Sequence, residues 1–478
     1  MKKFSVLIGL LIVVFAATAF AQPVEFKMSG FMDTLFALFE NIPAGSGTFD
    51  SFGNFWGDVP DPHSGVANRT GSGADSRARL KFQANVGKEL SGTIFMEMDS
   101  TTWGDTAGDR GKMGYWQADR AAVELKHVFF DVAVPYFGVN VPISMRFGIQ
   151  PFAIRPNWYM VSDGAGVNVS FNADPVNIQA FWAKPYEGKV YAADDTNVYA
   201  AVISGTVEGF TLGAHGAYWD INEYPIPTAN SPIGQQANAQ ADLYWFGGYA
   251  DGKYAGFQFQ ADFIYNGGEV NYIDGDQTKL GGWIGALAAD FPYECWDFGG
   301  GFWYATGADA NSTSKNKAYL IPPGSEFGPN GSFAAKYGSV YFGPGGWRGE
   351  HATATNSLHS VPTGSGLGGT WGASLYAGLK VTPWYKVYLN AMYLADTTKN
   401  GNTVGTAMDD TGEWRDDNGI GLEFTLTNIF QVYKNLTMDF VLGYMLAGDA
   451  YDVYDRDNLD NHEVDDPWLI GSRLVYTF

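Results

Sequence analysis

Between Arg77 and Val86, apolar and polar residues alternate without exception. In an extended strand this alternation places Arg77, Arg79 and Lys81 on one face and only apolar side chains on the other. A strand buried in a soluble sandwich would not carry three cations on one face unless that face were wet. A barrel wall with hydrocarbon outside and water inside requires this pattern. The alternation therefore predicts an all-β transmembrane barrel.

The same alternation recurs along the chain, interrupted by short turns such as Asn172–Pro175 and Asp251–Lys253. It places Phe129 and His127 on the outward side of their strand. The charged side chains that we expect to face inward and line a pore are Arg77, Arg79, Lys81, Glu97, Asp99, Arg120, Glu124, Lys126, Arg146 and Arg473.

The last twelve residues, Pro467 to Phe478, form a further strand with a mostly apolar face and an aromatic end. A terminal strand of this kind would leave an exposed edge in a soluble protein, whereas a closed barrel pairs it with the first strand. The segment also resembles the terminal signature by which the barrel-assembly machinery of Gram-negative bacteria recognises its clients. This machinery is therefore an expected partner during biogenesis.

The first 21 residues predict a secretory signal peptide, with Lys2 and Lys3, an apolar run to about Phe15 and the cleavage site Ala19-Phe20-Ala21. The run is too short to favour a permanent membrane anchor. Residues 22–478 are then one barrel domain in the outer membrane, in contact with outer-membrane lipid and lipopolysaccharide.

Composition fits a barrel of many short strands. Aromatic residues make up 16% of the chain and glycine occurs 61 times. Beyond the leader, no segment approaches the roughly 18 apolar residues that a spanning helix needs. We predict about 18 strands, with 16 as the alternative, short periplasmic turns and long extracellular loops. The single cysteine, Cys295, excludes an intramolecular disulfide.

The net charge of -22 argues against a nucleic-acid partner. Acidic residues cluster in two expected loops, at 409–417 and 449–466. They are either solvated surface charge or a place where calcium bridges to lipid headgroups. The segment Asp455–Asp460 lacks the glycine and the terminal glutamate of a calcium-binding loop. No metal site and no cofactor are therefore predicted, apart from this calcium alternative.

No catalytic motif is present: the chain contains no GxSxG, no HExxH and no Cys/His spacing typical of a metal site. We therefore expect no enzyme and assign no catalytic residue.

Four pieces between Ser76 and Tyr199, including SRARLKFQANVGKELSGTIFMEMDSTTWG and RFGIQPFAI, resemble the homotrimeric outer-membrane porins of sulfate-reducing bacteria. The resemblance implies a trimer of water-filled barrels for passive transport of small hydrophilic solutes and ions. In general porins the loop after the fifth strand folds into the barrel and narrows it. Its counterpart is residues 151–164, with Arg155, Trp158, Tyr159 and Asp163 as candidate constriction residues.

Two hypotheses follow for the inner charges. They either form a basic arc that sets ion selectivity, with Asp163 opposite it, or they neutralise one another along the wall.

Two other functions of the whole protein stay open. One is a substrate-selective channel in which Trp158 and Tyr159 stack on a solute. The other is a structural or adhesive barrel with a sealed lumen.

Overall fold

The computed structural model describes residues 23–41, 70–103, 123–134, 142–156, 158–188, 194–222, 240–271, 277–312, 314–323, 325, 338–341, 367–455 and 460–478. The predicted signal peptide and Arg120 lie outside these residues, as does the side chain of Asp99. No helix within these ranges is long and apolar enough to cross a membrane.

These residues form one 19-stranded sheet in which eighteen strands make a closed wall. The eighteen are β1 (Val24–Glu40), β2 (Thr70–Val86), β3 (Leu90–Thr102), β4 (Glu124–Ala133), β5 (Ile143–Ile154), β6 (Met160–Ala173), β7 (Val176–Tyr186), β8 (Thr196–Val207), β9 (Phe210–Ile221), β10 (Gln240–Tyr254), β11 (Phe257–Asn271), β12 (Gln277–Tyr293), β13 (Trp296–Ala305), β15 (Thr370–Thr382), β16 (Tyr385–Asp396), β17 (Gly419–Tyr433), β18 (Leu436–Ala447) and β21 (Trp468–Thr477).

Four short elements belong to the connections: β14 (Lys315–Asn316), the 3-10 turn η3 (Asp449–Tyr451), β19 (Val453–Asp455) and β20 (Asp460–His462). β14 adds to β12 as a parallel pair, whereas every neighbouring pair of wall strands is antiparallel.

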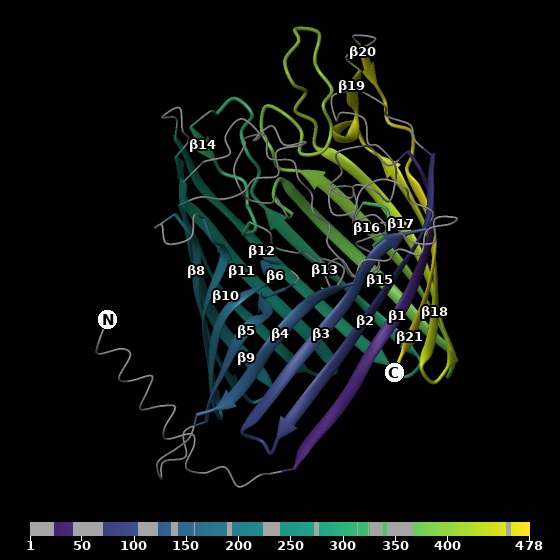
Figure 1. Cartoon of the computed structure of the whole chain (residues 1–478). Helices are drawn as coiled ribbons and strands as arrows, with labels where there is room; N and C mark the ends of the chain where they lie inside the picture. Colours follow the sequence, from purple (N-terminus) through teal and green to yellow (C-terminus); the bar gives the residue numbers. More distant parts are fainter. Residues whose placement is uncertain are drawn as a thin grey trace.

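The wall closes where β1 pairs with both β2 and β21. Phe478 takes part in this closure: its backbone N–H donates to the carbonyl of Gly30 at 3.0 Å, and its carbonyl accepts from the N–H of Gly30 at 2.9 Å. Short turns lie at one end of the barrel together with the start of β1 and the C-terminus, and the long connections lie at the other end (Figure 1). The prediction of about eighteen strands is confirmed, and the closed wall leaves no unpaired edge.

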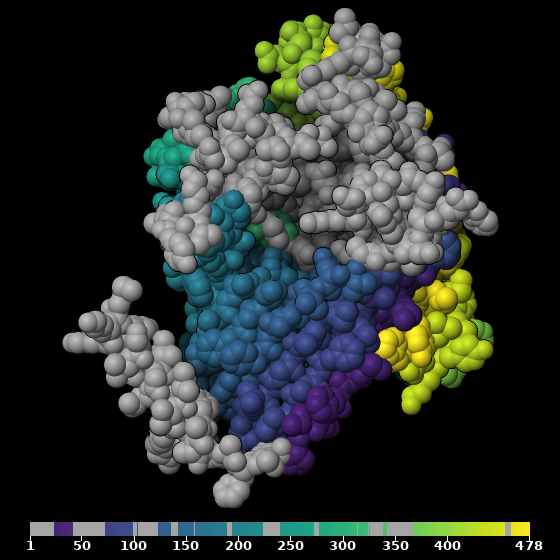
Figure 2. Space-filling view, viewed as in Figure 1, coloured from purple at the N-terminus to yellow at the C-terminus, as the bar shows by residue number. Residues whose placement is uncertain are grey.

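The outer face is apolar, and aromatic pairs lie near both ends of the strands. Phe257 stacks on Phe291 at 4.5 Å near the short turns, and Trp283 stacks on Tyr304 at 5.2 Å towards the long connections. The wall strands form a continuous surface below the long connections (Figure 2). Aromatic bands at two levels are typical of barrels that cross a membrane.

Strand β4 departs from the predicted alternation. The pairing of β3 with β4 shifts by one residue between Phe95 and Met96, so β4 has a bulge at Lys126. Beyond a bulge, side chains point to the face opposite to the one that the uninterrupted alternation predicts. His127 and Phe129 are therefore buried on the inner side, and the prediction that they face outward is wrong.

Candidate functional site: a hairpin inside the barrel

The predicted constriction segment is a β-hairpin rather than a loop. β5 and β6 remain paired from Gln150↔Gly164 to Ile154↔Met160, and beyond this pairing the Arg155 carbonyl accepts from the N–H groups of Trp158 and Tyr159. The pairing of β5 with β4 ends at Ile149, and that of β6 with β7 ends at Ala165. Residues 150–164, the lumen hairpin, therefore leave the wall on both sides.

Glycines and a buried glutamine occupy the point of departure. Gly148 has a φ of 125°, and a Cβ there would lie 2.2 Å from the carbonyl oxygen of Val128. A Cβ at Gly166 would lie 2.2 Å from the carbonyl oxygen of Trp182. The buried Gln150 amide donates to the Gly166 carbonyl at 2.9 Å. Only glycine fits this backbone approach, and Gln150 satisfies a carbonyl group that would otherwise lack a partner.

The tip of the lumen hairpin reaches the inner face of the far wall. The Arg155 guanidinium binds Asp262 of β11 at 2.5 Å and Asp251 of β10 at 2.6 Å, and lies 4.2 Å above the Tyr249 ring. The sequence predicted a turn at Asp251–Lys253, and this prediction is wrong, because β10 continues to Tyr254. Two ion pairs and an aromatic platform thus fasten the tip five strands away from its base.

The two aromatic residues of the tip are buried. Trp158 and Tyr159 are 0% and 1% exposed. Tyr159 stacks on His215 of β9 at 5.2 Å and lies 6.1 Å from Trp245 of β10. Neither ring offers a free face to a solute, so both act as packing residues for the hairpin.

A second segment holds the hairpin from the loop between β13 and β15. The Tyr319 hydroxyl donates to the carbonyl of Trp158 at 2.7 Å, and the Ser325 hydroxyl donates to that of Tyr159 at 3.2 Å. The Trp245 indole N–H donates to the carbonyl of Leu320 at 2.7 Å. This segment therefore joins the hairpin to β10 inside the barrel.

The base of the hairpin is charged. Asp163 accepts from Lys126 at 2.9 Å and from His127 at 2.7 Å, and Lys126 also binds Glu97 of β3 at 2.8 Å. Asp163 thus touches the charged wall directly and does not face it across open space. Because His127 and Lys126 both point inward at the bulge, β4 presents two partners to the same carboxylate.

Further along the wall, cations also meet acids. Asp33 of β1 accepts from Arg473 of β21 at 2.7 Å and from Arg77 at 3.5 Å. Arg79 binds Glu97, and Arg146 binds Asp131 at 2.7 Å. This arrangement matches the neutralised wall, one of the two alternatives left open by the sequence.

Lys81 differs from the other predicted cations. It is half-buried, and no acidic side chain within the described ranges pairs with it. Glu124 is exposed near the start of β4.

The sequence-based prediction missed four acidic residues of the inner face: Asp33, Asp131, Asp251 and Asp262. Alternation along β1 would have revealed Asp33, because Phe26, Met28 and Met32 all lie on the outward side.

The acidic loops bind their own chain. Asp409 accepts from the Thr411 hydroxyl at 2.6 Å, and this bond, with backbone N–H groups of Glu413 and Thr411, holds the pKa of Asp409 below its ordinary value. Burial raises the pKa of Asp452 above its ordinary value. The hydrogen bond from the Val464 N–H and the Arg415 guanidinium, 3.1 Å away, act in the opposite direction and offset part of this rise. Among the described residues, no three Asp, Glu, His or Cys side chains are grouped to hold a metal ion.

No family model matches the chain, and no curated protein matches its sequence. Solved structures share its fold. OccK9 (OpdG) of Pseudomonas aeruginosa is 11% identical with a TM-score of 0.51, covering 95% of this chain and 98% of that one. OccK11 (OpdR) of the same organism is 8% identical, with a TM-score of 0.50 and coverage of 95% and 96%. OccAB3 of Acinetobacter baumannii is 9% identical, with a TM-score of 0.50 and coverage of 95% and 100%.

At these identities the likeness concerns the fold. A closed antiparallel wall of eighteen strands with an apolar, aromatic-banded outer face defines the class of outer-membrane β-barrels. The chain is such a barrel, and its location is the outer membrane. The short turns accordingly lie on the periplasmic side and the long connections on the extracellular side.

Proposed function

We propose that the chain is a porin through which small hydrophilic solutes and ions diffuse passively. The lumen hairpin is the observation that carries this proposal. It leaves the wall at β5 and β6, crosses the interior and is fastened to β10 and β11 through Arg155. Barrels of 16–18 strands are wide enough for an aqueous channel, and an inward hairpin narrows that channel to a defined cross-section.

Weak ion selectivity follows from the paired wall charges. Arg77, Arg79, Lys126, Arg146 and Arg473 each contact a carboxylate, so their fields largely cancel at a distance. We propose that selectivity depends on Lys81 and on the hairpin rather than on a continuous basic arc. Diffusion of this kind needs no catalytic residue and no cofactor, and we propose none.

Shortening the hairpin tests the channel. Ile149 and Ala165 are paired neighbours, so an Asn-Gly turn can replace residues 150–164. Single-channel conductance in planar bilayers should rise above that of the unaltered chain, because the obstruction is gone. The matched control replaces residues 456–459 between β19 and β20 with the same turn, and its conductance should not change. Equal conductance of the hairpin variant and the unaltered chain would contradict the proposal.

A sealed structural or adhesive barrel is the second candidate, because loop segments other than the hairpin also enter the lumen. Ala318 to Ile321 are buried near β10 and β11, and the N–H groups of Ser339 and Tyr341 donate to Glu423 of β17 at 2.5 and 2.8 Å. A complete lack of ion conductance by the folded chain in a bilayer would favour this candidate over the porin.

The proposed assembly follows the sequence resemblance. We propose a homotrimer in the outer membrane of a Gram-negative cell, in contact with lipopolysaccharide and inserted by the barrel-assembly machinery after removal of residues 1–21. Chemical cross-linking of the folded chain in native membranes tests the trimer, and a single band at the monomer mass would exclude it.

A further inference from the structure

The lipid-facing side of β1–β5 contains a hollow. Register places Phe26, Ala84, Gly92, Phe130 and Phe147 in one row across the five strands, each paired with the next. The two smallest members lie in the middle of this row. A Cβ on Gly92 would meet no atom within 4 Å, so open space lies directly above it.

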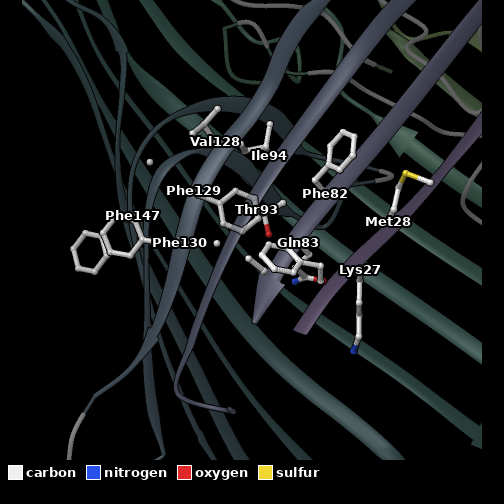
Figure 3. Close-up of a pocket in the computed structure, with 14 residues that line it drawn as sticks. Lys27, Met28, Phe82, Gln83, Thr93, Ile94, Val128, Phe129, Phe130 and Phe147 are labelled. Carbon is white, nitrogen blue, oxygen red and sulfur yellow. The ribbon is translucent and has the colours of Figure 1, made fainter. Parts of the chain in front are cut away.

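Larger side chains border this space, which is open to the outside of the wall. The row above contains Phe82, Ile94 and Val128, and the row below contains Val86 and Leu90. Phe130 and Phe147 stack at 5.3 Å and close one end. The result is an apolar hollow of about 670 Å³, here called the outer hollow (Figure 3).

The hollow lies on the outward side of the wall, which faces membrane lipid wherever no neighbouring subunit covers it. Leu90, Ile94, Phe82 and Phe130 are each 40% to 48% exposed and point outward. A void bordered by apolar side chains lacks dispersion contacts, and a flexible hydrocarbon chain can supply them. An acyl chain is therefore the chemically matched occupant.

A basic residue lies beyond the periplasmic end of the hollow. Lys88 is exposed in the turn between β2 and β3, four residues from both Ala84 and Gly92. Two strand residues at about 3.3 Å each separate the floor of the hollow from the paired strand ends at Val86 and Leu90, and the turn lies just beyond them, roughly 10 Å from the floor towards the periplasm. In the described part of the chain no acidic side chain forms an ion pair with the Lys88 ammonium, and the Glu89 carboxylate accepts instead from the backbone N–H of Lys88 at 3.0 Å. A long lysine side chain at a membrane interface can extend to a lipid phosphate.

We propose that the outer hollow binds one acyl chain of a phospholipid from the periplasmic leaflet, with the lipid phosphate beside Lys88. This site is on the outside of the wall and does not depend on the proposed channel. The charge at Lys88 favours a lipid over a second copy of the chain, because an apolar side chain from another subunit would need no cation at this distance.

A photoreactive phospholipid with a diazirine in the middle of one acyl chain tests the site. The mature chain is folded into vesicles that contain it, irradiated and digested, and the labelled peptides are identified by mass spectrometry. Label should concentrate on the Phe82–Ile94 segment relative to the outward segment around Gly205 of β8. Gly92→Phe should remove most of this label, since the new ring fills the hollow.

Matched variants separate the alternatives. Gly205→Phe should leave the label on Phe82–Ile94 unchanged, because a Cβ at Gly205 also meets open space, with a single atom 3.8 Å away. Lys88→Gln should reduce the label several-fold, whereas Lys434→Gln in another periplasmic turn should not. Label spread evenly around the barrel, or unaffected by Gly92→Phe, would overturn the proposal. Loss of oligomers in Gly92→Phe without any labelling of this segment would instead assign the hollow to a second copy.

Discussion

At the scale of single residues, the wall cations differ in whether they have a partner. Arg77 is buried against Asp33, whereas Lys81, four residues along the same face, is half-buried and lacks an acidic partner in the described structure. A paired charge acts mainly on stability, because its field is cancelled locally. An unpaired charge at the lumen acts on permeating ions.

Lys81→Gln should therefore move the reversal potential towards cation preference with little change in stability. Arg77→Gln should leave the reversal potential almost unchanged and should reduce the free energy of unfolding by about 2 kcal/mol. Reversal potentials under a salt gradient and urea unfolding in lipid vesicles measure the two effects. The assignment fails if Arg77→Gln shifts selectivity more than Lys81→Gln does.

Arg155 is the second residue whose role depends on its partners. Removal of the guanidinium leaves Asp262 buried without its cation, and breaking a buried ion pair from one side costs about 3–5 kcal/mol. Arg155→Gln should lower the midpoint of urea unfolding accordingly and should increase current noise in single-channel records, because the hairpin tip is no longer fastened.

The triple variant with Arg155→Met, Asp251→Asn and Asp262→Asn is the control for this prediction. It removes all the charges together, so it should recover much of the lost stability while the noise persists. Full stability of the single variant would show that the ion pairs contribute nothing to the fold.

At the scale of elements, the lumen hairpin depends on glycine where it leaves β5. Gly148→Val would place a branched side chain at a φ of 125° and within 2.2 Å of a backbone oxygen. Such a conformation is strongly disfavoured for a β-branched residue. We expect the folded yield of this variant to fall sharply, or its hairpin to leave the lumen with increased conductance.

Gel mobility with and without heating measures the folded fraction of the Gly148→Val variant, and single-channel conductance reports where its hairpin lies. Gly205→Val on β8 is the control and should fold normally. If both variants behaved alike, Gly148 would not be a requirement of the hairpin.

At the scale of the whole molecule, closure of the wall is completed by the last residue. Phe478 exchanges two backbone hydrogen bonds with Gly30, and its ring lies about 3.0 Å from the place that a Gly30 Cβ would occupy. Deletion of Phe478 removes the end of this closure. The proposed recognition by the barrel-assembly machinery would be lost as well.

The deletion should reduce outer-membrane levels in cells by a larger factor than it reduces the refolded yield in detergent. Quantitative blotting of membrane fractions and heat-modifiable gel mobility give the two numbers. An equal loss in both would assign the effect to closure alone, and no loss in either would contradict both roles.

The sequence by itself determined the class of fold. Successive side chains of a strand point to opposite faces, so the pattern from Arg77 to Val86 already indicated one face in contact with water and one in contact with lipid. The approximate strand number followed from the same local pattern. The sequence did not reveal the bulge at Lys126, because one extra residue is invisible until two strands are paired.

Only the tertiary structure decided where the hairpin goes and which charges meet. Arg155 lies 96 and 107 residues from Asp251 and Asp262 along the chain, and Arg473 lies 440 residues from Asp33. No local periodicity links such positions, because their contact depends on the register of every strand between them and on the curvature of the closed wall. Alternation could identify a wet, charged face, but pairing across the barrel determined which of its cations meet an acidic partner within the described structure.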